Sequence, residues 1–221
     1  KPNNVSGNTE LDLAESLNAS ADGRTYTATL KKNIKWHDGE RLTASDVAFT
    51  ISSIQNPDWK SPLAAIFRGV TVTTPDDQTV IIQLSQPASS FPGALSMGIL
   101  PEHLWKNVLP INGRLAELNL KPIGAGPFRF SSIKKDANGV IHAYTLERNP
   151  HTTETPAYLD HITIQFYDDA AQAYQALRDG QVDGMNRVTQ AARTKQPITK
   201  SIQSFTLRLP QYTALFLNQT A

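Results

Sequence analysis

The sequence contains no cysteine and has almost no net charge, and both deficits narrow the classes of function. Without cysteine no thiol chemistry is available, but the compartment stays open, because the absence fits an exported protein as well as a cytosolic one. The formal net charge is +1, from 21 basic and 20 acidic residues. This balance creates no field that would attract nucleic acid or an acidic membrane surface.

Long apolar runs are also missing. No window approaches the roughly 18 apolar residues of a membrane-spanning helix. In the polar opening Lys1-Pro2-Asn3-Asn4 we expect no signal peptide. The composition is that of a globular protein, with 221 residues of which 39% are hydrophobic and 19% charged. This length is sufficient for one large domain or two smaller ones with a buried core.

The clearest local patterns lie between Leu13 and Ile51. Thr25–Leu30 alternates polar and apolar residues, which predicts a half-buried strand. His37-Asp38-Gly39 predicts a turn, and Thr43 with Asp46 has the spacing of a capping box that starts a helix. The apolar positions of that helix are Val47, Ile51 and Ile54, with Trp36 expected to pack beneath the preceding turn.

Further along, two hairpins and a second helix are indicated. The first hairpin spans residues 69–84, and the second joins Phe128 to Leu146 through the pair Asn138-Gly139. Gly124-Ala125-Gly126-Pro127 breaks the chain before that second hairpin. A short helical turn or a loop is expected at 90–95, and short helical turns at 101–105 and 114–118. A strand is expected at 162–166, a helix at 170–177 and a return to extended structure at 182–185.

The segment from Ile162 to Met185 therefore looks like a strand–helix–strand unit, which favours at least one parallel pairing. Near the end of the chain we expect a helix at 189–195 and strands at 201–209 and 212–217. The fold class predicted from this order is mixed α/β. An early segment of strands and short helices is followed by a later one from about residue 121.

Eight collinear stretches of the chain form one recognisable series. They are Leu13–Ser16, Asp22-Gly23 with Tyr26-Thr27, Trp36–Gly39 with Leu42–Ala44 and Asp46-Val47, Leu100–Leu104, Pro122–Phe128, Leu146–Pro150, Tyr158–Ile162 and Ala176–Asp183. Each stretch is weak alone, but together they cover the chain from about Leu13 to its end and resemble the family 5 extracellular solute-binding proteins. Members of that family capture oligopeptides, dipeptides, nickel complexes and related solutes for ABC importers.

Three positions depart from the family pattern. Leu17 stands where a tryptophan is common, Ala125 where threonine is frequent, and His151 where tryptophan or tyrosine is usual. The chain is also much shorter than the family's two-lobed members. The resemblance implies a periplasmic-binding-protein type II-like first lobe: residues 1–120 as its strand-and-helix subdomain, and residues 121–221 as its central mixed-sheet part up to the hinge. The second lobe would be absent.

The resemblance also implies where a solute would lie. The strand Tyr212–Asn218 borders the cleft near the hinge in this family, so Tyr212, Thr213, Ala214 and Leu215 are the first candidates. Met97 and Gly98, in a loop before Pro101, are the second. Trp59 and Trp105 are aromatic groups that suit a cleft, but ordinary packing is the favoured interpretation. A single lobe is expected to bind weakly, because a cleft needs both walls to desolvate its ligand.

Other tempting sites have plainer interpretations. His37 and Asp38 suggest a metal site or catalytic pair, but no cluster of further ligands surrounds them, so a structural turn is favoured. The remaining histidines are scattered. Gly124–Pro127 lacks the lysine that follows a phosphate-binding loop. Asp168-Asp169 is best explained as a helix cap.

The function predicted from the whole sequence is the extracytoplasmic solute-binding component of an ABC transporter, with no catalytic residues, cofactor or metal. It would act in the periplasm or lipid-anchored at the outer face of the cytoplasmic membrane, as a monomer that captures a peptide or other small solute for a membrane permease. Two alternatives stay open. One is a sensor or interaction protein on the same fold, and the other is a hydrolase using His37 and Asp38.

Overall fold

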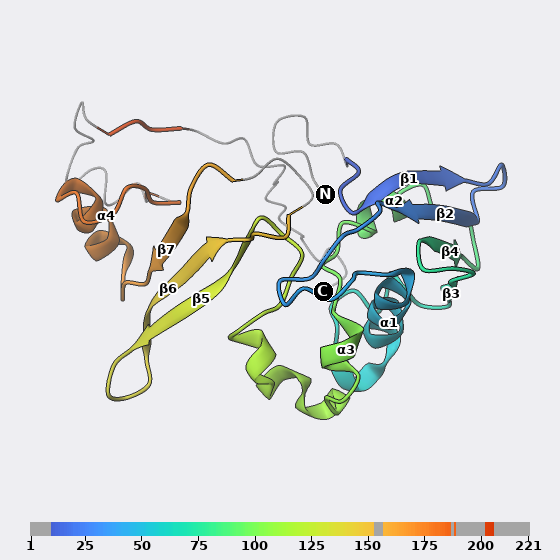
Figure 1. The fold of residues 1–221 in the computed structure, drawn as a ribbon, viewed down its shortest axis with the longest axis horizontal. Helices are drawn as coiled ribbons and strands as arrows, with labels where there is room; N and C mark the ends of the chain where they lie inside the picture. Colours follow the sequence, from blue (N-terminus) through green and yellow to red (C-terminus); the bar gives the residue numbers. More distant parts are fainter. Residues whose placement is uncertain (1–9, 153–156, 187, 189–201, 206–221) are drawn as a thin grey trace, which may run out of the picture. The chain divides into compact units, whose positions relative to one another are not determined.

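The computed structural model describes residues 10–152, 157–186, 188 and 202–205 (Figure 1). The chain forms two compact units. The first comprises Lys1–Lys134 and Tyr144–Ile164, and the second Lys135–Ala143 and Gln165–Ala221. Among the described residues, no helix is long and apolar enough to span a bilayer.

A four-stranded antiparallel sheet forms the main part of the first unit. Its strands β1 (Ala14–Ala19), β2 (Thr25–Leu30), β4 (Thr79–Gln83) and β3 (Thr71–Thr73) lie in the order β1-β2-β4-β3. Tyr26 pairs with Ile82, which in turn pairs with Val72, so the even-numbered residues of the central strands share one face. The alternation predicted at 25–30 and the hairpin predicted at 69–84 are both confirmed.

Helix α1 (Ala44–Gln55) covers that face of the sheet. The predicted capping box is present, and Asp46 Oδ2 accepts the Thr43 amide at 2.8 Å. The buried side chains of α1 include Val47, Ile51 and Ile54, as the sequence spacing predicted. The helix ends at Asn56, because Pro57 disfavours helical backbone at the residue before it, and a short 3₁₀ helix η1 (Pro57–Trp59) follows.

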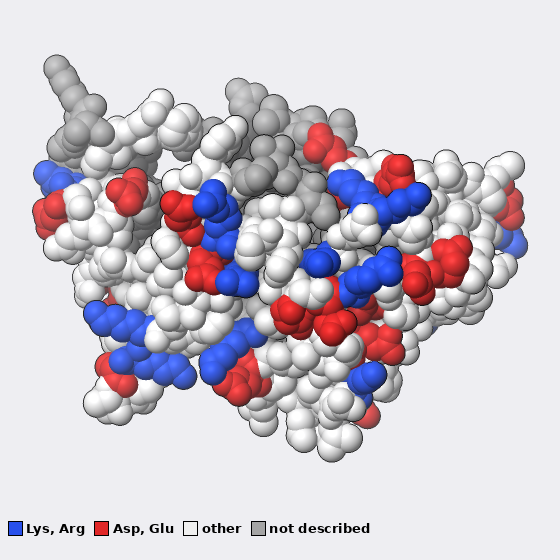
Figure 2. Space-filling model, in the orientation of Figure 1, with Lys and Arg blue, Asp and Glu red and all other residues white. Residues whose placement is uncertain are grey.

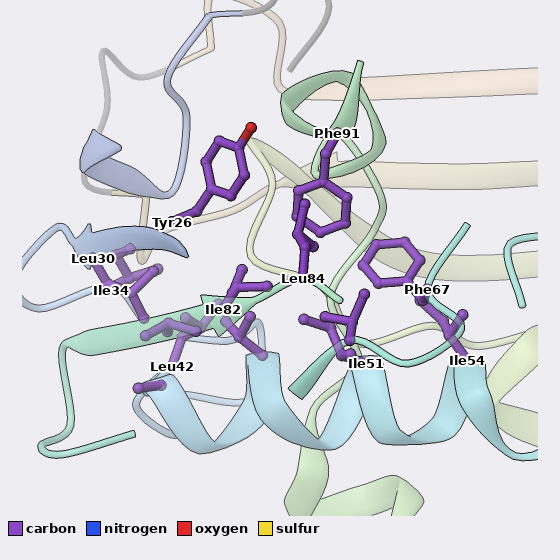
Figure 3. Close-up of a cluster of buried hydrophobic side chains, with 14 of the residues drawn as sticks. Tyr26, Leu30, Ile34, Leu42, Ile51, Ile54, Phe67, Ile82, Leu84 and Phe91 are labelled. Atoms are coloured by element: carbon purple, nitrogen blue, oxygen red, sulfur yellow. The ribbon is translucent and has the colours of Figure 1, made fainter. Parts of the chain in front are cut away.

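The hydrophobic core lies between α1 and the sheet (Figure 3). Phe67 and Phe91 close it at one end, with ring centroids 5.5 Å apart. Trp36 is 1% exposed, so the predicted packing beneath the turn is confirmed. The other buried members of the core are Tyr26, Leu30, Ile34, Leu42, Ala44, Val47, Ile51, Ile54, Val70, Val80, Ile82 and Leu84.

Four short helices follow the sheet. They are α2 (Phe91–Ala94), α3 (Glu102–Trp105), and the 3₁₀ helices η2 (Pro110–Leu115) and η3 (Glu117–Asn119). The first two agree with the helical turns predicted at 90–95 and 101–105, whereas the turn predicted at 114–118 is divided between η2 and η3 by the extended Ala116. Two buried side chains of α1 hold the approach to α3. Asp46 Oδ1 accepts the Glu102 amide at 2.8 Å, and the Thr50 hydroxyl accepts the Leu100 amide at 2.9 Å.

A second sheet contains β5 (Phe128–Lys135), β6 (Ile141–Arg148) and β7 (His161–Gln165), in that order. The turn between β5 and β6 has Gly139 at φ 84°, as the Asn-Gly pair predicted. The Arg148 amide donates to the Asp160 carbonyl and the Phe166 amide to the His142 carbonyl. Residue numbers rise along β7 while those of their partners in β6 fall, so β6 and β7 are antiparallel.

Helix α4 (Ala170–Arg178) belongs to the second unit. Asp169 Oδ1 accepts the Ala171 and Gln172 amides at 2.8 Å, which confirms the predicted cap. The prediction of an extended segment at 182–185 is wrong, because these residues form no strand. The parallel pairing predicted for the strand–helix–strand unit is therefore wrong too. The Gln181 amide still bonds back to the Ala176 carbonyl, so the chain is turning where a strand was expected.

Part of the later prediction lies outside the described residues. This applies to the helix expected at 189–195 and the strand expected at 212–217. Of the strand expected at 201–209, only Ile202–Phe205 is described, and these residues are not in a strand.

Candidate functional site

Three stretches that are far apart in the sequence meet at His37. The His37 amide donates to the Gly124 carbonyl at 2.8 Å, and the Gly124 amide donates to His37 Nδ1 at 3.0 Å. His37 Nε2 lies 3.1 Å from the Gly126 carbonyl oxygen. Because Nδ1 accepts a hydrogen bond, the ring proton is assigned to Nε2, which donates to Gly126. The imidazole is therefore neutral.

Asn149 completes this arrangement from the end of β6. Its side-chain Nδ2 donates to the same Gly126 carbonyl at 2.9 Å, and its amide donates to the Pro127 carbonyl at 2.8 Å. Asn149 Oδ1 accepts the His151 amide at 2.9 Å. At 1% exposure, Asn149 has its polar groups paired inside the protein. We call His37, Gly124, Gly126 and Asn149 the His37 junction.

Burial explains the electrostatics of the junction. His37 is 8% exposed, and burial lowers the pKa of its imidazole below the ordinary 6.5. The hydrogen bond to Gly126 and the carboxylate of Asp38 oppose that shift, while the charges of Arg129 and His151 add to it. Gly124 also lies close to the ring, since a Cβ there would be 3.2 Å from His37 Cε1, a tight contact.

Asp38 is engaged elsewhere. Its Oδ2 lies 2.8 Å from His103 Nε2 on α3, and its Oδ1 accepts the Glu40 amide at 3.2 Å. Since both nitrogens of His37 are held by backbone groups, His37 and Asp38 form no catalytic pair. The structural-turn interpretation is confirmed, and the geometry gives no support to a hydrolase. Among the described residues, no three His, Asp or Glu side chains are grouped to hold a metal ion.

Met97 lies at an apolar pocket of the first unit. The pocket encloses about 170 Å³ between the core face of the sheet and the loop after α2. Met97 is half-buried against the core, whereas a Cβ on Gly98 would meet nothing within 4 Å. Leu17, the position of the missing family tryptophan, lines the same pocket. Its other lining residues are Glu10–Ala14, Ala28, Leu30, Val47, Val80, Ile82, Pro92, Leu95, Ser96 and Ile99.

The two candidate tryptophans pack against each other. The ring centroids of Trp59 and Trp105 are 5.6 Å apart. The backbone of Gly113 in η2 lies against the Trp59 ring so closely that a Cβ there would come within 2.3 Å of Cζ3. The packing interpretation is therefore confirmed for both. Tyr212, Thr213, Ala214 and Leu215 lie outside the described residues.

Sequence reasoning did not identify the roles of Asp46 and Asn149 in linking distant segments. A signal for Asn149 was present, because an asparagine before a proline ends β6 and commonly bonds to nearby backbone. For Asp46 the cap was foreseen, but its second oxygen and the Glu102 amide are 56 residues apart. Local pattern carries no information over that separation.

Charged side chains of both signs are interspersed on the face drawn in Figure 2. Within the first unit, Arg129 lies 2.6 Å from Glu147, and Arg148 lies 2.7 Å from Asp160. Basic side chains in these places are thus paired with acidic ones.

Comparison with protein families gives a match over nearly the whole chain. The model of the bacterial extracellular solute-binding proteins, family 5 Middle, matches residues 8–221. The oligopeptide-binding protein AppA of Bacillus subtilis is 34% identical over 183 residues, which cover 81% of this chain and 33% of AppA. The chain thus spans about a third of the length of the curated relatives it matches.

Solved structures give the same result. AppA from B. subtilis, in complex with a nonapeptide, matches with a TM-score of 0.75 and 33% identity, over 82% of this chain and 36% of that one. The ABC transporter substrate-binding protein CtaP from Listeria monocytogenes matches with a TM-score of 0.71 and 33% identity, over 81% of this chain and 36% of that one. NikZ from Campylobacter jejuni, in complex with Ni(L-His), matches with a TM-score of 0.70 and 31% identity, over 77% of this chain and 33% of that one.

Proposed function

Because the chain belongs to the family 5 extracellular solute-binding proteins, we propose that it is part of the solute-binding component of an ABC importer. The observation that carries this proposal is the match over residues 8–221, together with the fold shared with peptide-bound AppA. The family is one of solute-binding proteins, and the proposal assigns no catalytic residue to this chain. Neither nitrogen of His37 is available as a base, which supports that assignment.

The solute in this proposal is a peptide or a similar small molecule. AppA was solved with a nonapeptide and NikZ with a nickel–histidine complex, so relatives at comparable identity hold different solutes. Tyr212, Thr213, Ala214 and Leu215 are proposed to face the solute. For Met97 and Gly98, the pocket beside Met97 and the open space at Gly98 support the same role. Capture takes place between two lobes, followed by hinge closure.

Residues 1–120 are proposed as the strand-and-helix subdomain of the first lobe, and residues 121–221 as its central part. The proposed partner is a permease in the cytoplasmic membrane. Family members are extracellular solute-binding proteins, so the proposed location is the periplasm or the outer face of that membrane, with lipid anchoring in the latter case. The proposed oligomeric state is a monomer. In its closed, solute-loaded form this monomer would dock on the transporter.

Calorimetry tests the function. Titrating the complete gene product with a library of short peptides should give saturable binding, whereas residues 1–221 alone should bind at least about tenfold more weakly, because one wall of a cleft desolvates less of a ligand. Nickel–histidine serves as a second solute in the same assay. Failure of the complete product to bind any peptide or the nickel complex would contradict a role in solute capture.

A further inference from the structure

The hydrogen bonds of His37 demand one protonation state. Nδ1 must accept a hydrogen from the Gly124 amide, while Nε2 must donate one to the Gly126 carbonyl. A protonated imidazole carries a hydrogen on both nitrogens. The Nδ1 hydrogen would then point at the hydrogen of the Gly124 amide, whose nitrogen lies 3.0 Å from Nδ1. The attraction would become a repulsion between two donors.

We infer that His37 is an acid-released latch: its neutral ring holds Gly124, at the start of the Gly124–Pro127 segment, against the His37–Gly39 turn, and protonation frees Gly124. The latch goes beyond solute binding and does not depend on it. Its two sides are 87 residues apart in sequence, so the contact is tertiary.

The charges around the ring decide how readily it takes up a proton. Asp38 on the same turn favours the cation, but its Oδ2 lies 2.8 Å from His103 Nε2. Arg129 on β5 and His151 after β6 disfavour the cation, although Arg129 is paired with Glu147 at 2.6 Å. Burial also lowers the pKa of His37, so the closed latch resists protonation and the open, hydrated one does not.

Release acts first on the ends of the second sheet within the first unit. Gly126 leads through Pro127 into β5, and Asn149 leaves β6. Both are tied to His37 through the shared Gly126 carbonyl, which accepts from His37 Nε2 and Asn149 Nδ2. When the Gly124 bond fails, the Gly126 carbonyl keeps its donors but the segment before it loses an anchor. The His37–Gly124 backbone bond then becomes exposed to solvent.

Amide hydrogen exchange of the whole chain tests the latch directly. Protection factors, corrected for the intrinsic pH dependence of exchange, are followed at the His37 and Gly124 amides between about pH 5 and pH 8. Below the ordinary histidine pKa, opening should become up to about tenfold more frequent per pH unit, since one proton is taken up on opening. Amides in β2, such as Thr27, exchange on global unfolding and should therefore stay more strongly protected than Gly124 at every pH.

Two variants provide the comparison. His37→Asn places an amide oxygen near the position of Nδ1 and does not titrate, so the pH dependence at Gly124 should disappear. The matched control His103→Gln removes the neighbouring titratable ring and should leave that dependence intact. Imidazole ¹⁵N shifts of the wild-type chain supply an independent readout, with an Nε2–H tautomer at neutral pH whose loss coincides with loss of Gly124 protection. Constant protection at Gly124 in the wild type, or an unchanged slope in His37→Asn, overturns the latch.

Discussion

At the scale of single residues, close approaches explain where the chain needs particular side chains. Gly124 lies on the imidazole of His37, and Gly113 lies on the indole of Trp59. Neither glycine is required by its backbone angles, because neither has a positive φ. At Gly113 a Cβ would overlap the indole, whereas at Gly124 it would make a tight contact with the imidazole.

Gly113→Ala should therefore lower the free energy of unfolding by about 1–3 kcal/mol, the usual cost of overpacking. The added Cβ would meet Trp59 Cζ3 at 2.3 Å and Cε3 at 2.6 Å, and an indole ring cannot bend away. Urea denaturation measures the loss. The control is Gly93→Ala, where a Cβ meets nothing within 4 Å. Equal effects of the two substitutions would show that the ring contact is unimportant.

At the scale of elements, α1 is positioned by polar groups as well as by its apolar face. Asp46, 3% exposed, caps the helix with one carboxylate oxygen and holds the start of α3 with the other. Thr50, one turn later, bonds to the Leu100 amide in the same way. These bonds fix the direction in which the chain leaves Pro101.

Asp46→Ala should cost about 2–4 kcal/mol of unfolding free energy, because it leaves the Thr43 and Glu102 amides without acceptors in a buried place. Asp46→Asn keeps one good acceptor and should cost less. Chemical denaturation compares both with Asp58→Ala, an exposed residue in the first turn of η1. A loss for Asp46→Ala no larger than for Asp58→Ala would contradict this account.

At the scale of the whole molecule, pH acts on stability through two windows. The folded state lowers the pKa of His37 below 6.5, so the unfolded chain binds the proton first as the pH falls. The contribution of His37 is complete above about pH 6.5 and is lost as the pH falls through its folded pKa. Exposed Asp22, Asp76 and Asp136 also have lowered pKa values, so their contribution is present above 3.8 and is lost below it.

The urea midpoint should consequently fall in two steps as the pH is lowered from 8 to about 3, with the first step beginning near pH 6.5. His37→Asn should remove the first step and leave the second. The second step should remain because its groups are hydrogen-bonded carboxylates distant in sequence from His37, such as Asp136 with His142. A wild-type midpoint that stays constant between pH 7 and pH 5 would contradict the role given to His37.

The sequence by itself determined the elements whose energetics are local. The alternation at Thr25–Leu30, the Thr43–Asp46 capping box and the Asn138-Gly139 turn each depend on neighbours a few residues away, so their patterns predicted them correctly. The same reasoning failed at 182–185, since whether a short segment becomes a strand depends on a partner strand. The resemblance to the family could also be found from the sequence, because the eight stretches that carry it follow one another in the family's order.

Only the tertiary structure decided what those motifs do. His37, Gly124 and Asn149 come from three different motifs, and the bond from Gly124 to His37 spans 87 residues. A side chain's partners over such distances are set by where the backbone segments converge, which no local pattern encodes. The fold therefore turned a histidine that suggested chemistry into a buried, neutral connector, and a pair of tryptophans that suited a cleft into packing around Gly113.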